Sequence, residues 1–429
     1  MHIYFSGIGG VGLGPLAEIS LDASFAVDGS DAQKGSMTAL LTKRGVTVAI
    51  GQDGAHIADV HQKNPIDWFV YTAALPADHP ELAFAQANGI RTSKRDELLA
   101  HIIDEKKLKL IAVAGTHGKT TTTGMLIWLF QQLGIPVSYC VGTTISFGPS
   151  GKFDPTSDYF IYECDEFDRN FLHFKPDFSL ITSIDYDHPD TYPTKQSYME
   201  AFHAFLAQSQ RSLLWQHDAS KLPSLPAHAN ICASSVDTSS ITLAGAHNRQ
   251  NGWLALQLLD QLHCADETTS APLLNSFPGT HRRFEKLGNN LFSDYGHHPV
   301  EIAATLQMAR ELSSHVVLVY QPHQNIRQHE IKNEYGSCME AAEMIYWLPT
   351  YLSREDPNLP ILTPEELTKN LTNNERVAIS DLNDELWQHI QAERKAGSLV
   401  LAMGAGSIDG WLRERVAAEP AGNTSSDPR

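Results

Sequence analysis

A lysine and a threonine that follow a glycine-containing turn are the residues best suited to phosphate chemistry in this chain of 429 residues. The segment LKLIAVAGTHGKTTTT at 108–123 reads as an apolar strand, the turn and then a helix. In such a frame Lys119 can contact the β- and γ-phosphates of a nucleotide, and the Thr120 hydroxyl can bind Mg²⁺. The usual loop, G-x-x-x-x-G-K-[ST], would need a glycine at position 113, where this chain has valine. We therefore predict a shortened phosphate loop; the alternative is a threonine-rich helix start that happens to contain Gly-Lys.

A second glycine-rich segment, SGIGGVGLG at 6–14, stands at the front of the chain. Gly7, Gly9 and Gly12 form G-x-G-x-x-G between an expected strand and helix, and Asp28 and Asp31 follow in the next strand. Glycines at this spacing let the backbone approach a pyrophosphate, which rests on the helix N-terminus. The motif indicates NAD or FAD, another ligand with a diphosphate, or only glycines in a tight turn.

Carboxylates gather after two later apolar segments. One group follows YFIY and the other follows FSLITSI; together they comprise Glu163, Asp165, Glu166, Asp185, Asp187 and His188. The carboxyl ends of parallel strands meet at one edge of a sheet, so we expect both groups to face the phosphate loop. Hard oxygen ligands there suit Mg²⁺ held against a nucleotide, although solvated loops and helix caps also use such residues. The segment SDYGHHP at 293–299 adds two histidines, a pairing that is more often at a surface than on a metal.

Composition narrows the classes of partner. A net charge of −18 argues against nucleic acid, which would require a basic face. The five cysteines lack C-x-x-C spacing, so we expect reduced thiols. The chain starts without the pattern of a signal peptide, and no apolar run approaches the ~20 residues of a membrane span. We expect a soluble, cytoplasmic protein that binds neither nucleic acid nor membrane.

Short apolar strands alternate with amphipathic helices along the chain, which predicts an α/β fold with mostly parallel sheets. We predict three domains: a Rossmann-like domain at 1–106, a central parallel-sheet domain of P-loop ATPase type at 107–276, and a Rossmann-like α/β domain at 277–417. A charged link at 104–109 and a loop, DETTSAPLLN at 266–275, connect them. The polar tail at 418–429 is expected to be disordered.

The chain resembles the Mur ligases in the order of six motifs, namely AGTHGKTTTT, ECDE, IDYDH, GAHNRQN, GTHRRF and DYGHHP. Members of this family use ATP to add amino acids to the cytoplasmic precursor of peptidoglycan. Their shortened phosphate loop binds ATP, and their N-terminal domain holds the UDP part of a sugar substrate. The resemblance thus implies two diphosphate ligands for the two loops and weakens the NAD interpretation.

The resemblance also implies roles for individual residues. Lys119, Glu163, His188 and Arg283 are expected to act in catalysis, with one Mg²⁺ on Thr120 and Glu163 and a second on His188. The residues expected to contact ATP are Gly115, Thr116, His117, Gly118, Lys119, Thr120, Thr121, Asn248, Asn251, Arg283 and Asp294. Of these, Asn248 and Asn251 are expected near the base, and Asp294 at the ribose or the hinge region. The residues expected to contact the other substrates are Gly7, Gly9, Gly10, Gly12, Ser30, Asp31, His297, His323 and Arg327. Of these, Arg327 is expected to bind the carboxylate of the amino acid, with His323 beside it.

Within the family, GIGGVGLG, GSD at 29–31, DYGHHP and QPH at 321–323 look most like the members that join L-alanine to UDP-N-acetylmuramate. The alternative is a ligase that attaches an intact tripeptide to the same sugar; a dinucleotide-dependent oxidoreductase and a non-catalytic nucleotide sensor are more distant. Ser293 stands where aspartate is common, Gln324 stands where arginine is frequent, and the stretch between IDYDH and GAHNRQN is short for the family. We expect a monomer or a weak homodimer.

Overall fold

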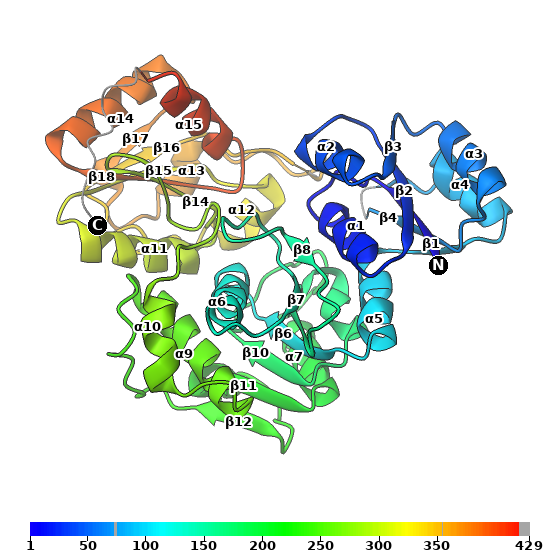
Figure 1. Ribbon diagram of the computed structural model, residues 1–429. Coiled ribbons are helices and arrows are strands. Elements are labelled where there is room, and N and C mark those ends of the chain that lie inside the picture. Colours follow the sequence, from blue (N-terminus) through cyan, green and yellow to red (C-terminus); the bar gives the residue numbers. More distant parts are fainter. Residues whose placement is uncertain (73–74, 354, 420–429) are drawn as a thin grey trace. The chain divides into compact units, whose positions relative to one another are not determined.

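The computed structural model describes residues 1–72, 75–353 and 355–419 (Figure 1). The chain forms two compact units, one of Met1–Ile241 with Asn251–Pro278 and one of Thr242–Gln250 with Gly279–Arg429. The described ranges contain three sheets, one within each predicted domain segment. The α/β class is therefore confirmed, whereas the domain boundaries stay predictions. Residues 420–429 of the tail that we expected to be disordered lie outside the described residues.

The first sheet is parallel throughout, in the order β3-β2-β1-β4-β5 (Figure 1). On its central strand Ile3 and Phe5 pack into one apolar cluster, and Tyr4 packs into another on the opposite face. This alternation is what a strand covered by helices on both faces requires. The elements are β1 His2–Ser6, α1 Leu13–Asp22, β2 Ala26–Asp31, α2 Ser36–Lys43, β3 Thr47–Ile50, α3 Ala55–Lys63, β4 Trp68–Tyr71, α4 Pro80–Ala87, β5 Arg91–Ser93 and α5 Arg95–Glu105.

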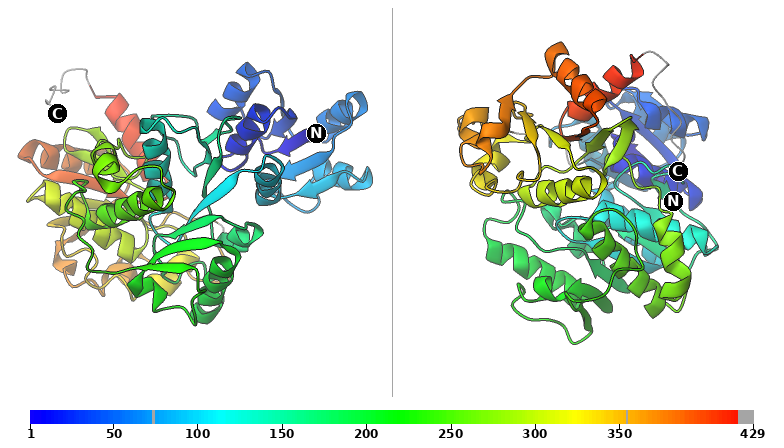
Figure 2. Two further views of the ribbon diagram at one scale, coloured as in Figure 1. Left: turned by 60° about the horizontal axis from the view of Figure 1, so that its bottom comes forward. Right: turned by 90° about the vertical axis from the view of Figure 1, so that its left-hand side faces the viewer.

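The second sheet, cyan to green in Figures 1 and 2, has the order β12-β11-β10-β6-β9-β7-β8. Strand β6, which leads into the phosphate loop, lies between the two acid-bearing strands: Val113 pairs with Glu163 of β9, and Ala114 pairs with Ile181 of β10. The elements are β6 Lys109–Ala114, α6 Lys119–Gln132, β7 Ser138–Cys140, β8 Gly151–Lys152, β9 Tyr159–Glu163, the 3₁₀ helix η1 Phe167–His173, β10 Phe178–Ile181, α7 Lys195–Gln208, β11 Arg211–Trp215, α8 Gln216–Ala219, β12 Ala229–Cys232, α9 Ala246–Gln261 and α10 Glu267–Asn275.

The structure corrects two expectations about connections. The segment 266–275, expected to be a loop, is helix α10, because Asp266 caps it by accepting a hydrogen bond from the Thr269 N–H, and because Ala271 and Leu274 are buried. The helix tolerates Pro272 in its interior. The charged link expected at 104–109 is shorter, since α5 continues to Glu105 and β6 begins at Lys109.

The third sheet has the order β13-β14-β18-β15-β16-β17, with β13 antiparallel to β14 and the other pairs parallel. The loops at the carboxyl ends of its parallel strands carry the residues expected to bind the substrate. The elements are β13 Glu285–Gly288, β14 Leu291–Asp294, α11 Pro299–Leu312, β15 Val316–Tyr320, α12 Asn325–Ile331, β16 Met344–Trp347, α13 Pro364–Thr368, the 3₁₀ helix η2 Asn374–Arg376, β17 Val377–Ile379, α14 Asp384–Ala396, β18 Leu399–Met403 and α15 Ile408–Ala417.

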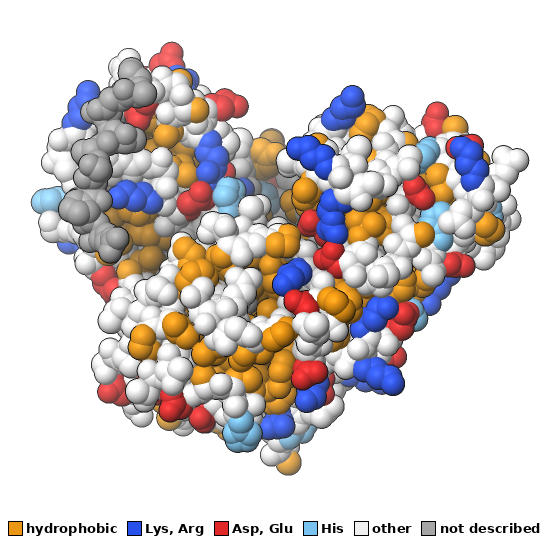
Figure 3. Space-filling model, viewed as in Figure 1, with side chains coloured by type: hydrophobic (Ala, Val, Ile, Leu, Met, Phe, Trp, Pro, Cys, Tyr) orange, Lys and Arg blue, Asp and Glu red, His pale blue; other side chains and the backbone are white. Residues whose placement is uncertain are grey.

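The surface in Figure 3 carries acidic and basic side chains that are interspersed with one another. Among the described helices, none combines the length and the apolar character that a membrane crossing demands.

Candidate active site

The phosphate loop connects β6 to α6, and its two glycines are required by its shape. Gly115 has φ 131° and Gly118 has φ 83°, conformations that residues with a Cβ rarely adopt. A Cβ on Gly115 would collide with Thr182, and one on Gly118 would lie 2.7 Å from Nδ2 of Asn251. The close approach of Asn251 brings this residue of α9 to the loop, as a shared nucleotide contact would require.

The side chain of Lys119 turns back into its own loop. Its Nζ donates hydrogen bonds to the Gly115 carbonyl at 2.6 Å and to both carboxylate oxygens of Glu166, at 3.1 and 2.8 Å. Burial acts to lower the pKa of Lys119, but the carboxylates of Glu166 and Asp165 outweigh it and raise that pKa. A charged lysine is therefore held at the start of α6, where phosphate oxygens are bound in loops of this type.

Thr120 and Glu163 form the pair expected to share a metal ion. The Thr120 hydroxyl donates to Oε1 of Glu163 at 2.6 Å, and the Gly142 N–H donates to Oε2 at 2.7 Å. The pair lies side by side because Glu163 ends β9, the strand next to β6. One hydroxyl and one carboxylate at this distance offer two hard oxygen ligands to Mg²⁺.

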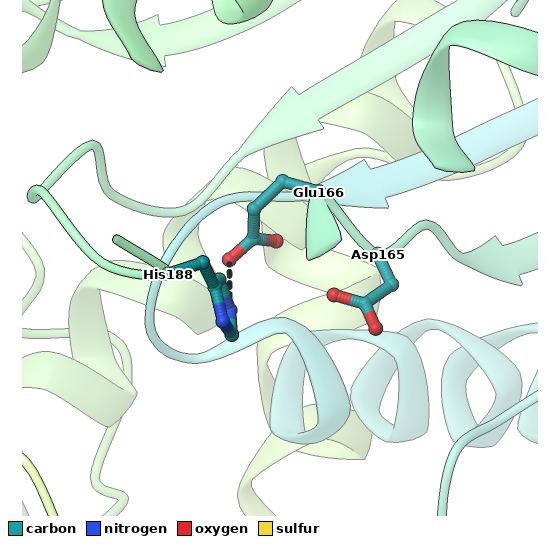
Figure 4. A group of neighbouring side chains, drawn as sticks. All are labelled: Asp165, Glu166 and His188. Atoms are coloured by element: carbon teal, nitrogen blue, oxygen red, sulfur yellow. Dashed lines mark ion pairs between the residues drawn. The ribbon is translucent and has the colours of Figure 1, made fainter. Parts of the chain in front are cut away.

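A second group of possible metal ligands lies at the ends of β9 and β10. One ligand atom each from Asp165, Glu166 and His188 lies within 4.8 Å of the others, and Figure 4 shows the Glu166 carboxylate facing the His188 imidazole. The His188 Nε2 is 3.6 Å from Oε1 of Glu166. Burial acts to lower the pKa of His188, but Glu166 and Asp187 raise it overall. Two carboxylates and an imidazole fit a divalent cation.

The resemblance implies His188 as a ligand of this second ion and implies no individual role for Asp165 or Glu166, although both belong to the carboxylate groups that we expected to suit Mg²⁺. Both stand in the ECDE motif, so the signal was present. Glu166 is the less obvious of the two because its carboxylate is completely buried. Burial raises its pKa, but Lys119 and His188 lower it further, so the pKa is lowered overall.

The remaining residues of the phosphate loop bind the segment that follows β10. The Thr116 hydroxyl donates to the Asp185 carbonyl at 2.7 Å and accepts from the Asp185 N–H at 2.8 Å. The His117 N–H donates to Oγ of Ser183 at 2.9 Å. Thr121 lies in the first turn of α6 and is half-buried. Thr116 and His117 thereby set the position of the loop, and their contact with a nucleotide stays a prediction.

The glycine-rich loop of the first sheet is tied to β2 through its backbone. The Ser30 carbonyl accepts hydrogen bonds from the N–H groups of Gly7 at 2.9 Å and Ile8 at 3.0 Å. Oδ2 of Asp31 accepts from the Gly9 N–H at 2.8 Å. Gly10 and Gly12 continue the loop, with the Gly10 N–H donating to the Gly7 carbonyl and Gly12 preceding the first residue of α1. Ser30 and Asp31 thus shape the loop expected to hold a diphosphate.

In the second unit, Arg283 lies in a backbone loop supported by Asp294. The neighbours Arg282 and Phe284 have φ 55° and 50°, in the left-handed region. Asp294 is buried and accepts the Phe284 N–H at 2.8 Å and the Gly296 N–H at 2.7 Å. Burial raises the pKa of Asp294. These bonds place Asp294 as a support for the Arg283 loop.

The amide of Asn248 belongs to the same unit, and its Nδ2 donates to the Ala244 carbonyl at 3.0 Å. Its expected contact with ATP stays a prediction, as does the expected contact of Asp294 with the ribose or hinge. Asn248 and Asn251 lie three residues apart on α9.

Aromatic rings line the carboxyl ends of β14, β15 and β16. The ring centroids of His297 and His323 are 5.7 Å apart, and His323 stacks on Tyr351 at 5.8 Å. The structure thus brings together the two histidines expected to contact the substrate and adds Tyr351. Arg327 lies in the first turn of α12 and is half-buried. Gln324, just before α12, has φ 62°, a strained value for a residue other than glycine.

Comparison with known proteins gives concordant matches along the chain. The models that match are the catalytic domain of the Mur ligase family over residues 2–107, the Mur ligase middle domain over 113–240 and the Mur ligase glutamate ligase domain over 282–406.

Two curated relatives are named UDP-N-acetylmuramate–L-alanine ligase. That of Nocardioides sp. is 32% identical, covering 95% of this chain and 94% of the relative; that of Renibacterium salmoninarum is 31% identical, covering 95% and 93%. Among solved structures, the UDP-N-acetylmuramate-alanine ligase MurC of Thermotoga maritima has the same fold, with a TM-score of 0.73, 21% identity and coverage of 97% of this chain and 98% of that one.

Proposed function

The chain belongs to the Mur ligase family, and we propose that it joins L-alanine to UDP-N-acetylmuramate in a reaction that cleaves ATP to ADP and phosphate. The names of the curated relatives, which match this chain over 95% of its length, support this substrate pair. The observation that carries the chemistry is the arrangement around the phosphate loop, where Lys119 and Thr120 each contact a glutamate from the neighbouring strand end.

The proposed reaction activates a carboxylate that is otherwise a poor electrophile. An oxygen of the lactyl carboxylate attacks the γ-phosphorus of ATP, the bond to the β-phosphate oxygen breaks, and an acyl phosphate and ADP result. The amine of L-alanine then attacks the acyl carbon, phosphate leaves, and the ammonium proton is released to solvent. The products are the amide, ADP and inorganic phosphate. The enzyme contributes mainly position and charge stabilisation.

The described residues can supply both contributions. Lys119 and Arg283 would balance negative charge on the phosphates. Mg²⁺, whose ligands we propose to be Thr120 and Glu163 for one ion and Asp165, Glu166 and His188 for another, would neutralise charge on the phosphate oxygens. Because Lys119 now donates to Glu166, it would exchange this bond for a phosphate oxygen when ATP binds. The glycine-rich loop would hold the UDP diphosphate, and Arg327 with His323 would hold the amino acid.

Phosphate release from ATP tests this assignment. The full-length protein is mixed with ATP, Mg²⁺ and UDP-N-acetylmuramate, and the amino component is varied among L-Ala, Gly, L-Ser, D-Glu and the intact tripeptide. We expect release to be fastest with L-Ala and to depend on the UDP sugar. Fastest release with the tripeptide would assign the chain to the tripeptide-attaching ligases, and no release with any component would indicate a non-catalytic nucleotide sensor. We propose the cytoplasm as the place of this reaction.

A further inference from the structure

A completely buried carboxylate lies behind the carboxyl edge of the first sheet. Glu81, in the first turn of α4, has an exposed fraction of 0%. Its Oε1 accepts a hydrogen bond from the Tyr4 hydroxyl at 2.9 Å, and its Oε2 accepts from the Ser6 hydroxyl at 2.6 Å and the Ser30 hydroxyl at 2.7 Å. Among the described residues, no lysine, arginine or histidine forms an ion pair with it. A buried carboxylate without a cation is costly even with three hydroxyl donors, which suggests a purpose other than packing.

The carboxylate determines the direction of the neighbouring hydrogen bonds. A carboxylate only accepts, and a serine hydroxyl has one proton to donate. Ser6 and Ser30 each donate this proton to Glu81, so each hydroxyl oxygen can only accept a hydrogen bond from its next partner. That partner is Gln52, whose Nε2 lies 2.9 Å from Oγ of Ser6 and 3.2 Å from Oγ of Ser30. The amide of Gln52 must therefore face inward with its NH₂ group and outward with its carbonyl oxygen, Oε1.

This carbonyl oxygen lies where the sheet binds ligands. Ser6 ends β1 and pairs in register with Ser30, and the next residue, Gly7, begins the glycine-rich loop. Gln52 follows β3 by two residues and is half-buried. In sheets of this kind ligands bind outside the carboxyl ends of the strands. Within the described ranges Oε1 of Gln52 has no hydrogen-bond partner, so the structure offers an oriented acceptor beside the diphosphate loop.

We propose that Gln52 Oε1 accepts a hydrogen bond from the nucleoside half of the nucleotide-sugar substrate, and that Glu81 is the positioning residue that orients it. The proposal rests on the proposed function, because the diphosphate on the glycine-rich loop would place a nucleoside nearby. Phosphate oxygens at neutral pH only accept, so the donor is either the imide N–H of uracil or a ribose hydroxyl. Both sources present the same chemistry to Gln52, a single hydrogen-bond donor.

Binding of nucleotides to the full-length protein, measured by isothermal titration calorimetry, tests the proposal. The probes are UDP, 3-methyl-UDP, which lacks the imide proton, and 2′-deoxy- and 3′-deoxy-UDP, which each lack one hydroxyl. We expect the wild type to bind one of the three analogues about five- to tenfold more weakly than UDP, the effect of one hydrogen bond. The analogue that loses affinity identifies the donor. In Gln52→Ala this difference should vanish, whereas Gln62→Ala, an exposed glutamine on α3, should retain it.

Glu81→Gln tests the positioning role, because an amide at this place can donate as well as accept and no longer dictates the direction of the serine hydroxyls. We expect this variant to lose most of the discrimination between UDP and the analogue although Gln52 is present. Thermal unfolding would check that Glu81→Gln is folded, and Gln52→Ala tests the ligand contact independently of it. Equal binding of UDP and all analogues by the wild type, or undiminished discrimination in Gln52→Ala, would overturn the inference while leaving the ligase assignment intact. Absence of UDP binding would overturn both.

Discussion

The ammonium of Lys119 lies 2.8 Å from Oε2 of Glu166, and the two residues join the phosphate loop to the loop after β9. Glu166 is completely buried, and 14% of the Lys119 side chain is exposed. Burial acts to lower the pKa of Lys119, but the neighbouring carboxylates outweigh it and raise that pKa. Burial acts to raise the pKa of Glu166, but Lys119 and His188 outweigh it and lower that pKa. Both side chains are charged at neutral pH, and each stabilises the buried charge of the other.

Removing only one residue of the Lys119–Glu166 pair should therefore lower the free energy of unfolding more than removing both. We expect Glu166→Leu to lower the free energy of unfolding by about 3–5 kcal/mol, and the double variant with Lys119→Met to recover part of this loss, because no unpaired buried charge remains. Urea denaturation of the four proteins of this cycle gives the coupling energy. The exposed pair Lys63–Asp59, with side chains 73% and 55% exposed, is the control and should couple by at most about 0.5 kcal/mol. A coupling as small for Lys119–Glu166 would contradict this account.

The proposed metal ligands should affect turnover rather than folding. We expect Glu163→Gln and His188→Ala to fold normally and to lower kcat by about 100-fold or more, because they act on charge that develops during phosphoryl transfer. The rate of phosphate release at saturating Mg²⁺ measures this. Glu97→Gln, at an exposed position on α5, should have wild-type turnover. Near-normal kcat in either test variant would remove that residue from the metal site.

Gly118 offers a test of the loop geometry with a matched control. Gly118→Ala adds a Cβ 2.7 Å from the Asn251 amide at φ 83°, whereas Gly134→Ala adds one at φ 67° with no atom within 4 Å. Both should lose about 1–2 kcal/mol of stability from the left-handed backbone. Only Gly118→Ala should also weaken ATP binding, by about tenfold or more, since the loop must shift. Calorimetric titration with ATP compares the two, and equal affinities would show that the contact with Asn251 does not shape the site.

Arg327 should select the amino-acid substrate if its guanidinium binds the carboxylate. Arg327→Lys keeps the charge but loses the two parallel donors. We expect KM for L-alanine to rise about tenfold, with little change in KM for ATP or the UDP sugar. Steady-state kinetics with each substrate varied in turn separates these effects, and Arg310→Lys, at an exposed position on α11, is the control. If the three constants rise together, Arg327 does not anchor the carboxylate.

His247 should make stability depend on pH. Burial lowers its pKa to about 4, below the usual value of about 6.5 in an unfolded chain. Between these values the unfolded state binds more protons, so the folded state loses stability as pH falls from about 6.5 to 4, by at most about 1.4 kcal/mol per pH unit. His247→Gln should reduce this slope in urea denaturation, whereas the exposed His389→Gln should not. An unchanged slope would mean that His247 is accessible to water.

Several features of the site could be predicted because they depend on local rules. The spacing of Gly115, Gly118 and Lys119 after an apolar strand predicts a phosphate loop, and the structure has that strand, loop and helix at 109–132. The rule that parallel strands share a carboxyl edge predicts that Glu163 and His188 lie near this loop, and β6 lies between β9 and β10. The sequence predicts a loop where the structure has helix α10, although Asp266 is a capping residue, because a proline within the segment favours a loop.

The sequence alone determined which residue types stand at the strand ends, since strand periodicity and loop spacing are local properties of the chain. Only the tertiary structure decided how those side chains divide among partners. Three acidic residues in ECDE are equivalent by spacing, yet Glu163 contacts Thr120 and Glu166 contacts Lys119, because the backbone turns after β9. Likewise Tyr4, Ser6, Ser30, Gln52 and Glu81 are scattered over nearly 80 residues. They form one hydrogen-bond network because β1, β2, α4 and the loop after β3 meet in space, and no pattern of spacing encodes the direction of its protons.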